Sequence, residues 1–377
     1  MAREQIWKYA DKEQIREFIL SLKLLPAKSR AQMSEEKQLS LLYALSNQAH
    51  RHYHMASLPK RDGGSRRLLV PDPLLKSVQR NILHHCLDGR EVSSYAYAYR
   101  RGLGLKEHAA VHATAGAAGG RRERGRQILK LDIRNFFDNI LFPRVYAFAF
   151  PAQLFPPAAA GLLAHLCCYY DRLPQGAPTS PAISNLVMKP FDESMGSWCG
   201  QRGILYTRYC DDLIFSGEFD AKAVYWKTKH FLEDMGFELN DAKTRLLHDG
   251  MRQTVTGIVV NEKPQVPASY RRKLRQEIYY CMEYGVFAHL ERLWGRAPLP
   301  EEEEAYMQAV QGRISYVLQI NPQDEAFGAY RREWAAAMEA AAGKAGDTGT
   351  GEERAEGRRT EERRIKERRI KERRIKE

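Results

Sequence analysis

The chain has 377 residues, 44% of them hydrophobic, and it carries a formal net charge of +12 with a pI of about 9.3. This length is enough for one large domain, or for two to three subdomains with an apolar core. The positive charge favours a polyanionic partner, either nucleic acid or an anionic membrane surface. Solubility alone is the alternative explanation for the charge.

The cysteines and the apolar segments limit the class of protein further. None of the six cysteines forms a CxxC pair and no Cys/His spacing indicates zinc, so we expect reduced thiols in a cytoplasmic protein. The charged N-terminus lacks the apolar run of a secretory signal. Residues 147–170 carry no charge, but Pro151, Pro156 and Pro157 interrupt them. We therefore predict a buried helix there and no membrane partner.

The predicted elements combine amphipathic helices with short apolar strands. Residues 1–56 show helical periodicity, and Asp62-Gly63-Gly64 predicts a turn between the basic arms of a hairpin over 59–71. Residues 101–126 are rich in Gly, Ala and Arg and show no clear period. The other predicted elements are, in chain order, a helix over 74–87, a strand over 128–132, a helix over 182–195, a hairpin over 204–216, a helix over 221–235, strands over 237–239 and 254–260, and basic aromatic helices over 269–342.

The last segment, residues 343–377, is of low complexity and repeats Arg-Arg-Ile-Lys-Glu three times. A five-residue period fits neither a heptad nor a helical stripe. We therefore expect a disordered or transiently helical tail. A nucleic-acid-binding arm and a neutral repeat expansion are both open interpretations of this tail.

Two adjacent acids, Asp211 and Asp212, lie at the tip of the hairpin predicted over 204–216. Neighbouring carboxylates on an apolar hairpin are costly unless a cation neutralises them. A third acid, Asp132, ends the apolar strand over 128–132. If the two strands are neighbours, the three acids can hold a pair of divalent ions, which is the apparatus for in-line phosphoryl transfer.

The order of several motifs makes this chemistry more specific. After the basic hairpin, the chain carries Asp-Ile-Arg-Asn-Phe-Phe at 132–137, Leu-Pro-Gln-Gly-Ala-Pro-Thr-Ser-Pro at 173–181, Tyr-Cys-Asp-Asp at 209–212, and Gly236-Phe237 with Asn240 and Lys243. Over residues 58–261 this ordered set resembles a reverse transcriptase. The resemblance implies an α+β right-hand polymerase fold with fingers, a palm that holds an antiparallel sheet, and a helical thumb. The implied domains are 1–127 for the N-terminal helices and fingers, 128–262 for the palm with a helical insertion at 173–200, 263–342 for the thumb, and 343–377 for the charged tail.

The resemblance also assigns metal ligands. Asp132 and Asp211 would bridge two Mg²⁺ ions, Asp212 would support the geometry, and the backbone carbonyl of Ile133 would complete one ion's shell. One ion lowers the pKa of the attacking hydroxyl, and the other neutralises the triphosphate and the leaving pyrophosphate. Lys243 resembles the lysine that protonates pyrophosphate as it leaves, and an ordinary surface lysine is the alternative. Asn240 belongs to the same motif, but an asparagine at this position could equally cap a helix.

Nucleotide contacts follow from the same resemblance. Phe137 matches the aromatic steric gate that clashes with a ribose 2′-hydroxyl, which implies deoxynucleotide substrates. Its alternative is a core phenylalanine, the role we expect for Phe136. Gln175 and Gly176 resemble the loop under the incoming nucleotide. The triphosphate clamp of the fingers, where arginine suits bidentate phosphate contact, would consist of Lys60, Arg66 and Arg67.

Three features resemble the retron type of reverse transcriptase. They are the short chain, the Val255-Thr256-Gly257 sequence, and Gly312-Arg313-Ile314-Ser315-Tyr316-Val317. His112 matches the histidine of the retron Asn-Ala-x-x-His sequence, but His108 stands in place of its asparagine. Cys210 replaces the alanine of the usual Tyr-Ala-Asp-Asp. The candidate RNA contacts are His112, Val255, Thr256, Gly257 and the basic positions Arg271, Arg272, Lys273 and Arg275, for which a solvated helix surface is the alternative.

A retron-type enzyme would bind a structured non-coding RNA and prime from the 2′-hydroxyl of an internal guanosine. It would copy part of that RNA into branched, multicopy single-stranded DNA and act in anti-phage defence. Its expected partners are the RNA template, the RNA–DNA hybrid, dNTPs and a separate effector protein. The alternatives are a group II intron-like or other stand-alone bacterial reverse transcriptase, a catalytically silent RNA-binding scaffold, and a two-metal nuclease.

Overall fold

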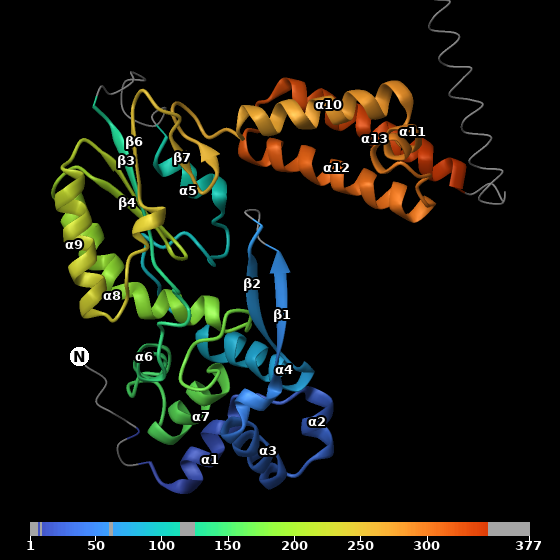
Figure 1. The fold of residues 1–377 in the computed structure, drawn as a ribbon. Coiled ribbons are helices and arrows are strands. Elements are labelled where there is room, and N and C mark those ends of the chain that lie inside the picture. Colours follow the sequence, from blue (N-terminus) through green and yellow to red (C-terminus); the bar gives the residue numbers. More distant parts are fainter. Residues whose placement is uncertain (1–6, 8–9, 60–62, 114–124, 346–377) are drawn as a thin grey trace, which may run out of the picture. The chain divides into compact units, whose positions relative to one another are not determined.

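The computed structural model describes residue 7 and residues 10–59, 63–113 and 125–345. The chain divides into two compact units, Met1–His112 with Glu123–Gln253, and Ala113–Arg122 with Thr254–Glu377. Both units combine helices with antiparallel strands (Figure 1). The predicted α+β class is therefore confirmed. Residues 346–377 of the charged tail predicted over 343–377 lie outside the described residues.

The first unit begins with short helices that pack together through apolar side chains such as Ile19 and Leu42. Asp11 opens the first helix with a capping box, because its carboxylate accepts from the N–H of Gln14 and the Gln14 side chain accepts from the Asp11 N–H. These elements are α1 (Lys12–Ser21), α2 (Ala27–Gln32), α3 (Glu35–Asn47) and the 3₁₀ turn η2 (Ala49–His52).

The predicted basic hairpin is present as β1 (Tyr53–Pro59) and β2 (Ser65–Pro71), which pair in antiparallel register. Residues 60–62 of its turn lie outside the described residues. The hairpin leads into α4 (Pro73–Ile82), where proline at the first helical position and an aspartate cap at Asp72 fix the start. The helix predicted over 74–87 ends in a π-helical segment, η3 (Leu83–Leu87).

A four-stranded antiparallel sheet in the order β4-β5-β3-β6 forms the centre of the first unit. Its strands are β3 (Gln127–Asp132), β4 (Leu205–Tyr209), β5 (Asp212–Gly217) and β6 (Arg245–His248). A two-residue turn joins β4 to β5, as the sequence predicts for 204–216. Leu129 and Leu131 of β3 and Leu213 and Phe215 of β5 are buried in the same core as the N-terminal helices.

Two long helices support this sheet. α8 (Ser180–Gly200) packs against β4, and α9 (Ala221–Asp234) packs against α8 (Figure 1). Asp220 caps α9, and Gly236 with φ of 70° follows its last turn. The remaining elements of this unit are α5 (Leu105–Val111), α6 (Phe142–Arg144), η5 (Val145–Ala149), α7 (Pro157–Cys167) and η6 (Asp241–Lys243).

The uncharged segment over 147–170 contains α7, most of whose side chains are buried, as predicted. None of the described helices is long and apolar enough to cross a membrane. The strand predicted over 237–239 is wrong. The N–H of Phe237 donates to Leu232 at the end of α9, and only Leu239 forms a bridge, to Ile133.

The described part of the second unit contains a small hairpin and four helices. The single strand predicted over 254–260 is wrong, because Thr256 and Gly257 adopt φ values of 45° and 85° and turn the chain back on itself. Trp334 is fully buried in this unit, and its Nε1 donates to the carbonyl of Met307 at 3.1 Å. The elements are β7 (Thr254–Val255), β8 (Ile258–Val259), α10 (Ala268–Tyr284), α11 (Val286–Trp294), α12 (Pro300–Ile320) and α13 (Glu325–Ala345).

Candidate active site

Two neighbouring strands bring the three predicted acids together at one end of the central sheet. β3 ends at Asp132, and β5 begins at Asp212, which is its direct partner in the antiparallel register. Asp211 lies in the turn between β4 and β5, and its carbonyl accepts a hydrogen bond from the N–H of Ile133 at 3.0 Å. The condition on which the phosphoryl-transfer hypothesis rests, that these two strands are neighbours, is therefore met.

The three carboxylates repel one another in surroundings that water reaches poorly. Burial and the nearby charge of Asp132 raise the pKa of Asp211 above its ordinary value. Burial and the carboxylate of Asp211 raise the pKa of Asp212 to about 6. Both shifts reflect negative charge that the surrounding protein compensates only partly. A bound cation would relieve this repulsion.

Two side chains from the segment after α9 hold Asp132. Lys243 Nζ donates to Asp132 Oδ2 at 2.8 Å, and Asn240 Nδ2 donates to Oδ1 at 3.1 Å. The N–H of Asn240 also donates to the Asp132 carbonyl at 2.8 Å. The Asn240 side chain makes no cap hydrogen bond to η6, so it contacts a catalytic candidate instead of capping a helix. The hydrogen bond to Asp132 raises the pKa of Lys243.

The oxygen atoms at this site are of the chemical types that bind Mg²⁺. Carboxylate and carbonyl oxygens are the ligands that this ion prefers, and the site offers them from Asp132, Ile133, Asp211 and Asp212. Within the described part of the chain, no group of three or more His, Cys, Asp or Glu side chains forms a ready metal cage. Mg²⁺ usually binds through one or two carboxylates together with substrate phosphates and water. Substrate would therefore supply part of the coordination.

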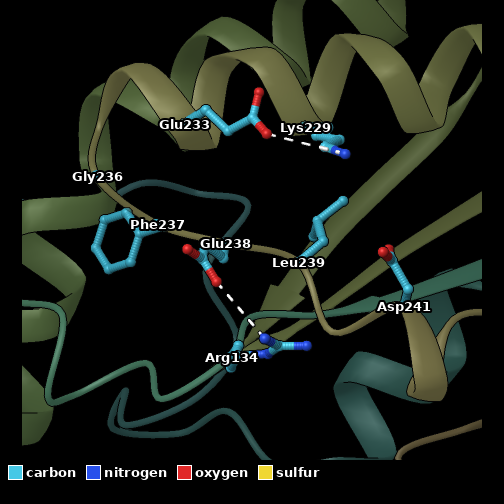
Figure 2. Close-up of a pocket in the computed structure, with 8 residues that line it drawn as sticks. All are labelled: Arg134, Lys229, Glu233, Gly236, Phe237, Glu238, Leu239 and Asp241. Atoms are coloured by element: carbon cyan, nitrogen blue, oxygen red, sulfur yellow. Dashed lines mark ion pairs between the residues drawn. The ribbon is translucent and has the colours of Figure 1, made fainter.

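The segment that carries Asn240 and Lys243 borders a cleft of about 360 Å³ (Figure 2). The N–H of Arg134 donates to the carbonyl of Glu238 at 2.8 Å, which fastens this segment to the exit of β3. Arg134 pairs with Glu238 at 3.7 Å and Lys229 pairs with Glu233 at 3.9 Å, so these ion pairs neutralise most of the charge of the lining. The lining consists of Arg134, Lys229, Glu233, Gly236, Phe237, Glu238, Leu239 and Asp241.

The predicted nucleotide loop is attached to the basic hairpin. The N–H of Leu69 in β2 donates to the carbonyl of Gln175 at 2.8 Å. Gly176 has φ of 126°, and a Cβ at this position would lie 2.7 Å from the Leu69 carbonyl oxygen. Only glycine tolerates both this conformation and this approach. The structure thus joins the loop at 175–176 to the strand that carries two of the predicted triphosphate contacts.

The other predicted nucleotide contacts differ in exposure. Arg66 and Arg67 are exposed on β2, whereas Lys60 lies outside the described residues. Phe136 is buried and stacks on Phe237, with ring centroids 5.9 Å apart. Phe137 is only half-buried, which leaves part of its ring available to a ligand.

The structure corrects the prediction that His112 contacts RNA, because this side chain is fully buried. Its Nδ1 lies 2.7 Å from Ser216 Oγ and its Nε2 lies 2.6 Å from Thr207 Oγ1, while His108 Nε2 lies 2.7 Å from the same Thr207 hydroxyl. Burial lowers the pKa of His108 to about 3 and the pKa of His112 well below its ordinary value. Two neutral rings therefore fasten α5 and the residue after it to β4 and β5.

The remaining RNA-binding candidates belong to the second unit. Val255 is buried, which excludes contact between its side chain and RNA, whereas Thr256 and Gly257 form the turn between β7 and β8. Arg271 is half-buried, and its Nη2 lies 2.6 Å from Asp324 Oδ2, so its charge already has an internal partner. The exposed basic side chains on this part of α10 are Arg272, Lys273 and Arg275.

Sequence reasoning missed a buried ion pair next to the acidic turn. Arg208 in β4 and Asp192 in α8 are both fully buried, and Nη2 lies 2.6 Å from Oδ2. The signal that could have revealed it is an arginine inside an apolar strand, because a buried charge is almost always paired. Its partner could not have been identified from periodicity alone.

Comparisons of the sequence with known proteins identify the family to which the chain belongs. Residues 58–276, more than half of the chain, match the family described as reverse transcriptase (RNA-dependent DNA polymerase). The Retron Mx65 reverse transcriptase of Myxococcus xanthus is 32% identical over 303 residues, which cover 75% of this chain and 65% of that protein. The Retron Ec86 reverse transcriptase of Escherichia coli is 28% identical over 220 residues, which cover 57% of this chain and 65% of that protein.

A further relative is the Retron Mx162 reverse transcriptase of Myxococcus xanthus, 29% identical with coverage of 60% of this chain and 52% of that protein. The chain thus spans between about half and two thirds of the length of these curated relatives. Among solved structures, the chain resembles telomerase from Candida albicans in complex with the TWJ fragment of telomeric RNA, with a TM-score of 0.42, 11% identity, and coverage of 76% of this chain and 61% of that one. The chain belongs to the reverse transcriptase family, and these curated relatives are reverse transcriptases of retrons.

Proposed function

We propose that this protein is an RNA-directed DNA polymerase that copies a structured non-coding RNA into single-stranded DNA. The observation that carries this proposal is the pairing of Asp132 with Asp212, and the adjacency of Asp211, at one end of the central sheet. Clustered carboxylates of this kind serve nucleotidyl transfer. The match over 58–276 and the names of the relatives support the choice of an RNA template.

Each remaining site residue has a part in the proposed reaction. Two Mg²⁺ ions bound at the carboxylates would lower the pKa of the attacking hydroxyl and neutralise the triphosphate. Lys243 gives a proton to pyrophosphate as it leaves, and Phe137 excludes substrates with a 2′-hydroxyl. The loop at Gln175 and Gly176 supports the nucleotide. The triphosphate contacts are Lys60, Arg66 and Arg67.

The finer proposal concerns the product and the biological role. Resemblance to retron enzymes supports priming from the 2′-hydroxyl of an internal guanosine and a branched, multicopy DNA product. It also supports a role in anti-phage defence together with a separate effector protein. Thr256, Gly257 and the exposed cations Arg272, Lys273 and Arg275 are the proposed RNA contacts in the second unit, because exposed cations can follow a phosphate backbone.

Substitution of Asp211 tests the polymerase proposal. We expect Asp211→Asn to abolish Mg²⁺-dependent extension of a DNA primer on an RNA template, while RNA binding measured by filter retention stays within about twofold of the parent. Asp234→Asn is the matched control, because Asp234 is an exposed aspartate at the end of α9. Extension by Asp211→Asn at the parent rate would refute the assignment. Mg²⁺-dependent cleavage of nucleic acid without dNTPs would favour the nuclease alternative.

Sequencing the nucleic acid that co-purifies with the protein tests the retron proposal. We expect single-stranded DNA joined to one structured RNA through a 2′,5′ linkage, and its absence from the Asp211→Asn preparation. A purified protein that extends primers in vitro but carries no linked RNA–DNA from its native host would support the stand-alone alternative.

A further inference from the structure

The guanidinium of Arg208 links α8 to the acidic turn. Its Nε donates to Asp192 Oδ1 at 2.9 Å, and its Nη2 donates to Asp192 Oδ2 at 2.6 Å and to Asn185 Oδ1 at 3.1 Å. The other terminal nitrogen, Nη1, donates to the carbonyl oxygen of Cys210 at 3.1 Å. One buried side chain therefore binds two residues of a long helix and one peptide group of the turn that carries Asp211.

The position of Arg208 is itself fixed on both sides. Its backbone N–H donates to the carbonyl of Tyr95 at 2.8 Å, and its carbonyl accepts from the N–H of Tyr97 at 2.8 Å. The Asn185 side chain, in turn, donates to the carbonyl of Ala98 at 2.9 Å. These hydrogen bonds fix the backbone of Arg208 and one partner of its guanidinium. We infer that the guanidinium restrains the turn that carries Asp211.

The turn needs such a restraint because Cys210 is not a glycine. This residue adopts φ of 60°, in the left-handed region that side chains disfavour. A residue in such a conformation persists only where its surroundings hold it there. The Arg208 hydrogen bond falls on the carbonyl of that same residue, directly before Asp211.

We propose that Arg208, held by Asp192, is a positioning residue that sets the location of Asp211 and Asp212 for metal binding. This inference rests on the proposed polymerase function and adds a residue to it that makes no contact with substrate. Residues that orient metal ligands from outside typically change metal affinity by about 10- to 100-fold when they are replaced. A purely structural ion pair would change stability and leave the metal affinity of the folded protein unaltered.

Two variants separate these roles. Arg208→Lys keeps a charge opposite Asp192, but an ammonium lacks the planar fork that reaches Asp192, Asn185 and Cys210 together. The triple variant Arg208→Met, Asp192→Leu, Tyr206→Phe replaces the buried pair with apolar groups, a change that folded proteins often tolerate. Tyr206→Phe is included because the tyrosine hydroxyl donates to Asp192 Oδ1 at 2.8 Å.

Arg90→Lys is the matched control. Arg90 also donates to two backbone carbonyls, Ala149 at 2.7 Å and Phe148 at 3.2 Å, but it holds no part of the acidic turn. Binding of Mn²⁺ alone, followed by electron paramagnetic resonance without nucleic acid or dNTPs, gives a readout that does not depend on activity. The Mg²⁺ concentration for half-maximal primer extension and the thermal midpoint complete the measurements.

We expect Arg208→Lys and the triple variant to bind Mn²⁺ about tenfold more weakly than the parent. They should need correspondingly more Mg²⁺, whereas Arg90→Lys behaves as the parent. A folded triple variant with the parent's Mn²⁺ affinity overturns the inference. If the triple variant does not fold, the affinity of folded Arg208→Lys decides, and if neither folds, Arg208 serves the fold alone and the inference is rejected. Failure of the polymerase proposal is distinguishable, because the parent would then extend no primer whatever its Mn²⁺ affinity.

Discussion

The ammonium of Lys243 lies 2.8 Å from Oδ2 of Asp132, although the two residues are 111 positions apart in the chain. This contact raises the pKa of Lys243 above that of an ordinary lysine, so the group stays protonated throughout the neutral range. If Lys243 is a general acid, Lys243→Ala should slow single-nucleotide incorporation by about 100-fold, as loss of an acid catalyst commonly does. Rapid-quench measurement of the incorporation rate checks this expectation.

Lys243→Arg serves as the control for charge, because arginine stays positive but does not release a proton in proteins. We expect it to be nearly as slow as Lys243→Ala. The parent's rate should show no loss from deprotonation of Lys243 between pH 7 and 9, since the raised pKa puts that loss at higher pH. Recovery of the full rate by Lys243→Arg would leave Lys243 with an electrostatic role only.

The pKa of Asp212, raised to about 6, predicts how stability depends on pH. The folded protein holds this proton more tightly than the unfolded chain does, so the folded state loses stability as the pH rises from about 4 through about 6. Asp212→Asn removes this loss. At pH 8 without Mg²⁺ it should raise the free energy of unfolding by about 3 kcal/mol, and at pH 4 it should have little effect. Urea unfolding in EDTA at both pH values measures the difference.

The stabilising effect of Asp212→Asn should also depend on whether Mg²⁺ is present. An ion that binds the folded carboxylates stabilises the parent by mass action. The advantage of Asp212→Asn at pH 8 should therefore shrink as Mg²⁺ is added. Asp234→Asn, at an exposed position on α9, should leave the profile unchanged. Equal stabilisation by Asp212→Asn at pH 4 and pH 8 would show that the carboxylate charge is not the cause.

The cluster of Asp132, Asp211 and Asp212 could be predicted because its motifs are local. Asp132 ends one apolar run and Asp211 lies at the tip of a hairpin, and both features are visible within a few residues. The Arg208–Asp192 pair joins residues 16 positions apart on a strand and a helix, so no periodicity reveals it. His112 illustrates the same limit, since a motif identifies the residue type and only tertiary packing shows that the ring is buried.

Local propensity also misled the strand prediction over 254–260. Threonine and valine favour strands because their branched side chains suit a pleated surface. Thr256 nevertheless adopts a positive φ next to Gly257, and the chain forms a hairpin of two very short strands. The preference of a β-branched residue was outweighed here by a turn that the sequence signals only through one glycine.

The half-buried ring of Phe137 predicts the sugar selectivity of the enzyme. If Phe137 is the proposed steric gate, Phe137→Ala should lower the preference for dNTPs over rNTPs by about 10- to 100-fold, since the bulk that would clash with a 2′-hydroxyl is removed. Phe136→Leu is the control, because Phe136 is buried against Phe237 and should affect stability without changing selectivity. Competitive incorporation of dNTP and rNTP on one template measures the ratio. An unchanged ratio in Phe137→Ala would reject the steric gate.

The close approach of Gly176 to β2 predicts a defect in nucleotide binding. In Gly176→Ala the new methyl group meets the Leu69 carbonyl oxygen at 2.7 Å, at a φ of 126° that alanine disfavours. The loop must therefore move away from the strand that carries Arg66 and Arg67. A loss of about 1.4 kcal/mol in nucleotide binding would raise KM for dNTP about tenfold. Steady-state primer extension at varied dNTP concentration measures this change.

Gly161→Ala is the control for the glycine substitution itself. Gly161 lies within α7, and an added Cβ there meets no atom within 4 Å. Because alanine is the better helix former, Gly161→Ala should stabilise the protein by up to about 1 kcal/mol and leave KM unchanged. A folded Gly176→Ala protein with the parent's KM would show that the loop at 175–176 does not bear on the nucleotide. Its hydrogen bond to Leu69 would then serve only to anchor the basic hairpin.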